Sequence, residues 1–147
     1  MLPLSDGMKP RRFPIVTVAL IAANLAVWML YELPDLDGSI RQASFYACDV
    51  ENTCDSPQPW PISWFTAMFL HGGFLHLAGN LLFLWIFADN VEDALGHGRF
   101  LLFYLASGVT ATLRQAFLSP ASTIPNLGAS GAVAGVLGAY FVLYPRA

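Results

Sequence analysis

The sequence predicts an all-α fold, a polytopic transmembrane bundle with four membrane helices. Of its 147 residues, 56% are hydrophobic and only 12% are charged, whereas a soluble domain carries about 25% charged residues. The mean hydropathy is +0.55, and the apolar residues gather into long runs separated by polar segments. The weak net charge of −3 argues against a surface that binds nucleic acid.

The apolar runs define the expected helices. Three of them have roughly 18 to 20 residues, close to the ~20 that cross a hydrocarbon layer of about 30 Å. The first run is longer than a signal-peptide core and lacks a clear cleavage site, which indicates an uncleaved anchor. We expect one domain, 1–147, with a cytoplasmic N-terminus 1–13, helices 14–31, 74–93, 100–118 and 130–144, an outer loop 32–73 and a re-entrant loop 119–129.

Basic residues predict the orientation of this bundle. Most of the Lys and Arg side chains fall on one side of the membrane if the N-terminus is cytoplasmic, as the positive-inside rule requires. Those on the cytoplasmic side are Lys9, Arg11, Arg12, Arg99 and Arg146. Cys48 and Cys54 then lie in the outer loop, where either a disulfide or two free thiols is chemically permitted.

The last apolar run is too short to span the membrane. From Gly131 to Tyr144 it covers roughly 21 Å, so Ser130 lies about 9 Å below the outer face. The segment 119–129 must dip into the membrane to reach Ser130. Irregular backbone at that depth survives only when it is buried in protein or lines a wet cavity. We therefore expect an aqueous pocket that opens to the outside.

Two polar residues of the second membrane helix lie at a similar depth. Counted back from Glu92, His76 is roughly 24 Å and Asn80 roughly 18 Å from the cytoplasmic end, and the two share one helix face. They could serve only as interhelical hydrogen bonds, which contribute about 0.6 kcal/mol on average. Ionisable residues inside a membrane are more often functional, and the matched depth favours a site that includes Ser130.

Ser130 also has a structural interpretation. The glycines that follow it form a small-residue face of the kind that lets membrane helices pack closely. Its position at a helix N-terminus instead suits a nucleophile, because unpaired N–H groups there stabilise an anionic intermediate. His71 is expected near the outer rim and His97 on the cytoplasmic side. Three histidines divided in this way predict no metal site.

The motifs together resemble one known family. The stretches "HGGFLHLAGNLLFLWIFADNVEDALGHGRFLLFYLASG" and "PNLGASGAVAGVLGAYFVLYP" closely resemble the rhomboid family of intramembrane serine proteases. The likeness is strongest over residues 64–145. It joins, in order, an H-x-x-x-N motif, a V-E-x-x-x-G-x-x-[RK] turn and a G-x-S-G motif, and this ordered combination is far more specific than any one of them.

This resemblance implies a function for each motif residue. Ser130 matches the family's nucleophile, while His76 and Asn80 match the side chains that donate to the oxyanion, together with the Ser130 backbone N–H. Gly128 and Gly131 match the glycines of the serine motif. The resemblance implies no metal and no organic cofactor. It also implies that the partners are the lipid bilayer and membrane-anchored protein substrates with helix-destabilising residues near the cleaved bond.

The sequence departs from the family pattern at two points. Rhomboid proteases have at least six membrane helices and take their catalytic base from a histidine on the sixth, whereas this chain stops at Ala147. We therefore expect a truncated domain, the N-terminal two-thirds or so of the enzyme. The tryptophan–arginine pair of the family's first outer loop is also absent, since Pro61 follows Trp60 and Phe65 follows Trp64.

Two other functions remain open at this stage. One is a catalytically inactive rhomboid-like protein that binds membrane clients, although such a protein need not keep Ser130, His76 and Asn80. The other is a transporter, which would have charged residues along a path below Asn80, and none occurs before Asp89. The compact layout favours a bacterial plasma membrane.

We predict that residues 1–147 alone do not hydrolyse peptides, because a serine hydroxyl without a base within hydrogen-bond reach is a weak nucleophile. The measurement is cleavage of a transmembrane substrate by the purified chain in lipid vesicles. Cleavage that disappears in the Ser130→Ala variant would contradict the prediction. The intact mass of the natural gene product, compared with 16.0 kDa for this chain, shows whether further helices exist.

Overall fold

The computed structural model describes residue 7 and residues 10–145, so Lys9 and Arg146, used above to predict orientation, lie outside the described residues. Within the described part of the chain, every regular element is a helix, which confirms the all-α fold class. Three helical segments are long and apolar enough to cross a membrane. The protein is therefore an integral membrane protein.

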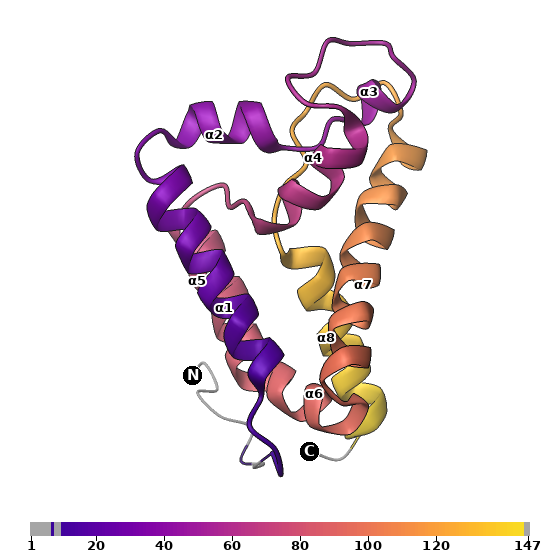
Figure 1. Cartoon of the computed structure of the whole chain (residues 1–147). Helices are drawn as coiled ribbons and strands as arrows, with labels where there is room; N and C mark the ends of the chain where they lie inside the picture. The colour runs from indigo at the N-terminus through magenta and orange to yellow at the C-terminus, as the bar shows by residue number, and fades with distance from the viewer. Residues whose placement is uncertain (1–6, 8–9, 146–147) are drawn as a thin grey trace.

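The first two spanning segments each contain a π-helical stretch. The first joins α1 (Ile15–Val27) to η1 (Trp28–Glu32). The second joins α5 (Phe74–Phe83), η3 (Leu84–Ala88) and α6 (Asp89–Leu95). In Figure 1 these two segments lie next to each other, and their elements also make contacts in the structure.

The third spanning segment is α7 (His97–Leu118), which starts earlier than the expected residue 100. Gly96, with a φ of 81°, separates it from α6, and the chain reverses direction there (Figure 1). The next helix, α8 (Ser130–Leu143), has 14 residues. It packs along α7 and begins part-way along that helix. The structure therefore contains a short fourth helix of the kind that the sequence predicts.

The expected outer loop contains short helices of its own. They are α2 (Leu36–Ala43), α3 (Ala47–Val50) and α4 (Trp60–Thr66), the last extended by the 3₁₀ turn η2 (Ala67–Phe69). Asp35 caps α2, because its carboxylate accepts a hydrogen bond of 3.0 Å from the Gly38 N–H. In Figure 1 these helices gather at the end of the bundle opposite α6. We call residues 33–73 the outer region.

The segment between α7 and α8, residues 119–129, is hydrogen-bonded to this outer region. Phe45 and Asn126 form an antiparallel bridge, with N–H to O distances of 3.0 and 2.8 Å. The Gly128 N–H donates to the Ala67 carbonyl at 2.8 Å. These bonds satisfy polar backbone groups that would otherwise be unpaired close to the membrane.

A disulfide holds part of the outer region in place. Cys48 and Cys54 are bonded, so of the two alternatives left open by the sequence the structure contains the disulfide. The Cys48 N–H donates to the Ser122 carbonyl at 3.2 Å, and the Thr53 N–H donates to the Cys48 carbonyl at 3.0 Å. The small covalent loop therefore adds another attachment point for residues 119–129.

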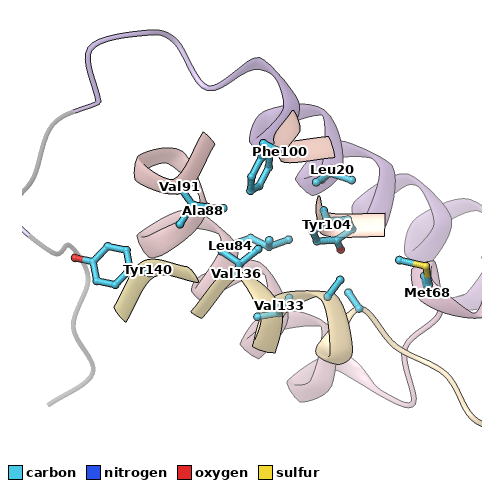
Figure 2. Packing of buried hydrophobic residues seen from close by; sticks show 12 residues of the cluster. Leu20, Met68, Leu84, Ala88, Val91, Phe100, Tyr104, Val133, Val136 and Tyr140 are labelled. Atoms are coloured by element: carbon cyan, nitrogen blue, oxygen red, sulfur yellow. The ribbon is translucent and has the colours of Figure 1, made fainter. Parts of the chain in front are cut away.

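Small residues allow α7 and α8 to pack closely. A methyl group added at Gly131 would collide with Ala111, and one added at Gly135 would collide with Ser107. Around this contact lies the main apolar core, with contributions from α1, η3, α6, α7 and α8 (Figure 2). Its buried members include Leu20, Leu84, Val91, Phe100, Tyr104, Val133, Val136 and Tyr140.

At the α6 end of the bundle, Glu92 joins α6 to the start of α1. Its carboxylate is buried and accepts hydrogen bonds from the Val16 N–H at 2.9 Å, the Thr17 N–H at 2.8 Å and the Thr17 hydroxyl at 2.7 Å. It also pairs with Nδ1 of His97. The first N–H groups of a helix lack partners within the helix and favour a negative charge. Glu92 supplies both the hydrogen-bond acceptor and the negative charge at the start of α1.

We predict that Glu92→Ala lowers the free energy of unfolding by about 3 kcal/mol or more, because several buried donors lose a charged acceptor together. The measurement is a denaturant titration of the protein in detergent micelles, followed by tryptophan fluorescence. The neighbouring Asp93→Asn serves as the matched control and should change stability by about 0.5 kcal/mol or less. Equal losses in the two variants would contradict the assigned interaction.

Candidate functional site

Ser130 is the first residue of α8 and its side chain is exposed. Ala129, directly before it, is buried and anchors the helix start in the core. The first N–H groups of α8 have no partner further back in the same helix, and the helix dipole places positive potential there. The hydroxyl of Ser130 thus lies where a developing negative charge is stabilised.

His76 approaches Ser130 across Gly128. A Cβ built on Gly128 would lie 2.7 Å from Cε1 and 3.0 Å from Nε2 of His76, and 3.5 Å from Oγ of Ser130. The imidazole and the hydroxyl therefore flank the same glycine. The structure brings together three residues that the sequence singles out, although α5 and α8 are separated by the whole of α7.

Gly128 is required here for two independent physical reasons. Its φ of 116° is a backbone conformation that residues with a side chain rarely adopt. The position that a Cβ would occupy is already too close to the His76 ring. Its N–H is held by the Ala67 carbonyl, so the outer region fixes the backbone directly before the serine. The other motif glycine, Gly131, serves a different purpose, since it packs against Ala111 of α7.

Asn80 lies one turn after His76 on α5 and is buried. Its side-chain Nδ2 has no hydrogen-bond partner among the described residues. A buried amide donor without a partner is unfavourable by about 1–3 kcal/mol, which makes Asn80 a candidate for a role beyond packing. His76 and Asn80 thus lie along one face of the helix.

His71 lies in the turn directly before α5, and the structure buries it completely. Its expected place near the outer rim of the membrane stays a prediction. Its partner is Glu32, the last residue of η1, which is also fully buried and which sequence reasoning missed. The signal for Glu32 was an acidic side chain directly at the end of an apolar run.

His97 lies at the other end of the bundle, paired with Glu92. Among residues 7 and 10–145, no group of three His, Cys, Asp or Glu side chains is placed to hold a metal ion. The described residues at the candidate site offer a serine hydroxyl, the N–H groups of a helix start, an imidazole and an amide.

Comparison with known proteins points to one family. A family model described as "Rhomboid domain" matches residues 57–147. The chain is 38% identical over 129 residues to the rhomboid protease GluP of Bacillus subtilis, a match that covers 86% of this chain and 24% of the relative. No solved structure matches the chain.

Mitochondrial proteins are also similar. Rhomboid protein 1 of Saccharomyces cerevisiae is 31% identical over 133 residues, covering 88% of this chain and 36% of the relative. The human presenilin-associated rhomboid-like protein is 29% identical over 146 residues, covering 97% of this chain and 35% of the relative. The chain thus spans between about a quarter and about a third of the length of these three relatives.

We predict that Gly128→Ala destabilises the protein by about 1–3 kcal/mol, because alanine at this φ is strained and its methyl group displaces His76. The matched control is Gly138→Ala on α8, where nothing lies within 4 Å of the added methyl group. That substitution should be neutral or stabilising, by up to about 1 kcal/mol. Denaturant titrations of both variants measure the change in the free energy of unfolding. A Gly128→Ala variant as stable as Gly138→Ala would contradict the predicted strain at Gly128.

Proposed function

We propose that this chain, which belongs to the rhomboid family, forms the serine-bearing part of an intramembrane serine endopeptidase. The observation that carries the proposal is the position of Ser130. It is exposed at the start of a helix too short to span the membrane, directly across Gly128 from the imidazole of His76. A serine needed only for packing would be buried against a neighbouring helix instead.

The proposed reaction follows from these positions. The Ser130 hydroxyl attacks the carbonyl carbon of the substrate peptide bond while a base takes its proton, and the carbonyl oxygen becomes an oxyanion. The Ser130 N–H, His76 and Asn80 donate to this oxygen. The proton passes to the leaving amine as the C–N bond breaks, and a water molecule then releases the acyl group from Ser130. Donors of this kind contribute about 10²–10³ each to the rate.

The base is the part of this mechanism that the described residues do not supply. His71 is buried against Glu32, and His97 lies at the far end of the bundle. We propose that the base is a histidine outside residues 1–147, which would complete a Ser–His dyad. The short coverage of the longer relatives, 24% for GluP, supports a larger natural protein.

The substrates are proposed to be membrane-anchored proteins with helix-destabilising residues near the cleaved bond. A helical substrate hydrogen-bonds its own backbone, so it must unwind locally before Ser130 and the donors can reach a carbonyl. We further propose a bacterial plasma membrane, with the N-terminus in the cytoplasm and water entering from the outer side. The similarity to the Bacillus protein supports the bacterial assignment.

A client-binding protein without catalysis is the second candidate. The observation in its favour is that the described residues place no base beside Ser130, together with the similarity to a protein named as rhomboid-like. Both candidates predict that membrane proteins bind near Ser130. They differ in whether bound proteins are cleaved.

In the natural full-length protein, reconstituted in lipid vesicles with a transmembrane substrate, we predict that Ser130→Ala abolishes cleavage. His76→Ala should lower kcat by about 10²–10³. Ser119→Ala, at the exposed start of the same loop, is the control and should cleave like the wild type. Full activity in Ser130→Ala would contradict the proposal, and binding without any cleavage by the wild type would favour the client-binding protein.

A further inference from the structure

A buried acidic residue and a buried histidine lie next to His76, and the proposed reaction does not use either of them. Glu32 and His71 are both fully buried. Oε1 of Glu32 accepts a hydrogen bond of 2.6 Å from the backbone N–H of His71, and its Oε2 lies 3.9 Å from Nδ1 of the His71 ring. Burying an ionisable pair is unfavourable unless it is well compensated, so its presence beside the site requires an explanation.

The pair is connected to His76 through the backbone. Gly72 directly follows His71, and the Gly72 N–H donates to Nδ1 of His76 at 3.3 Å. Glu32 holds the preceding N–H, so it fixes the orientation of this turn. Gly73, with a φ of 156°, then leads into α5. The position of the Gly72 donor therefore depends on the Glu32 carboxylate one residue earlier.

The hydrogen bond from Gly72 determines where the proton of neutral His76 lies. A neutral imidazole has one N–H and one acceptor nitrogen. Because Nδ1 accepts from Gly72, the proton must be on Nε2. Nε2 is the ring nitrogen beside Gly128, the glycine that also lies next to Oγ of Ser130. The turn thus presents an N–H donor, rather than a lone pair, to the place where the oxyanion would form.

The His71 ring fixes the orientation of the His76 ring as well. The two ring centroids are 5.4 Å apart, with an interplanar angle of 67°. This edge-to-face arrangement is a favourable one for aromatic rings. Because His71 is completely buried, its ring has little freedom to move, and its packing restricts the orientation of the His76 ring.

We infer that Glu32 and His71 are positioning residues, which hold His76 as the tautomer protonated on Nε2 and direct this N–H toward Ser130. Neither residue touches the substrate in this arrangement. The catalytic meaning of the inference rests on the proposed function, but the tautomer itself is measured without turnover. A wrong tautomer assignment can therefore be told apart from a wrong proposed function.

The test uses the 147-residue chain, labelled with ¹⁵N in its histidine rings and embedded in lipid nanodiscs. Protonated and unprotonated ring nitrogens have well-separated ¹⁵N shifts, and the three histidines are assigned by substituting each in turn. The wild type should show His76 with a protonated Nε2 and an unprotonated Nδ1. A proton on Nδ1 in the wild type would overturn the inference.

Three variants test the contribution of Glu32. Glu32→Ala removes the acceptor and should give a mixture of His76 tautomers, whereas Glu32→Gln keeps an acceptor oxygen and should retain the wild-type pattern. Glu32→Asp shortens the side chain and should also give a mixture, which decides the question if Glu32→Ala fails to fold. The control is Glu51→Ala, an exposed acidic residue of the outer region. A pure Nε2–H signal in both the Ala and Asp variants contradicts the positioning role.

Discussion

Backbone that is not helical must find its hydrogen bonds inside the protein when it lies within a membrane. The sequence predicts that the segment before Ser130 dips into the membrane, and in the structure the hydrogen-bond partners of this segment are backbone groups of Phe45, Cys48 and Ala67 in the outer region. Those partners lie in or beside the short helices and the disulfide of the outer region. The position of Ser130 thus depends on residues more than 60 positions earlier.

Other interactions hold the rest of the bundle together. At the far end, the buried Glu92 carboxylate satisfies the first N–H groups of α1 and ties that helix to α6. Between α7 and α8, glycines bring the two backbones close, so dispersion contacts replace the hydrophobic effect that lipid does not provide. α8 is therefore held at its start by the loop and along its length by α7.

Much of this arrangement follows from sequence patterns. The lengths of the apolar runs predict the three spanning helices and the short fourth one, and helical spacing predicts that His76 and Asn80 share a face. The role of Glu32 could not be predicted, because its partner is the backbone N–H of His71, which has no sequence signature. The short helices of the outer region were missed for a similar reason. They have only 8, 4 and 7 residues, which is too short for a sequence period to identify a helix.

The central claim is that Ser130 is a nucleophile, and covalent labelling tests it most directly. The natural full-length protein, in its membrane, would be treated with a fluorophosphonate, a reagent that modifies only activated serine hydroxyls, and the labelled peptide identified by mass spectrometry. If Ser130 is the nucleophile, it will be the one modified residue, with no label in a variant that lacks the histidine proposed as the base. Labelling of another serine, or none in a preparation that cleaves its substrate, would contradict it.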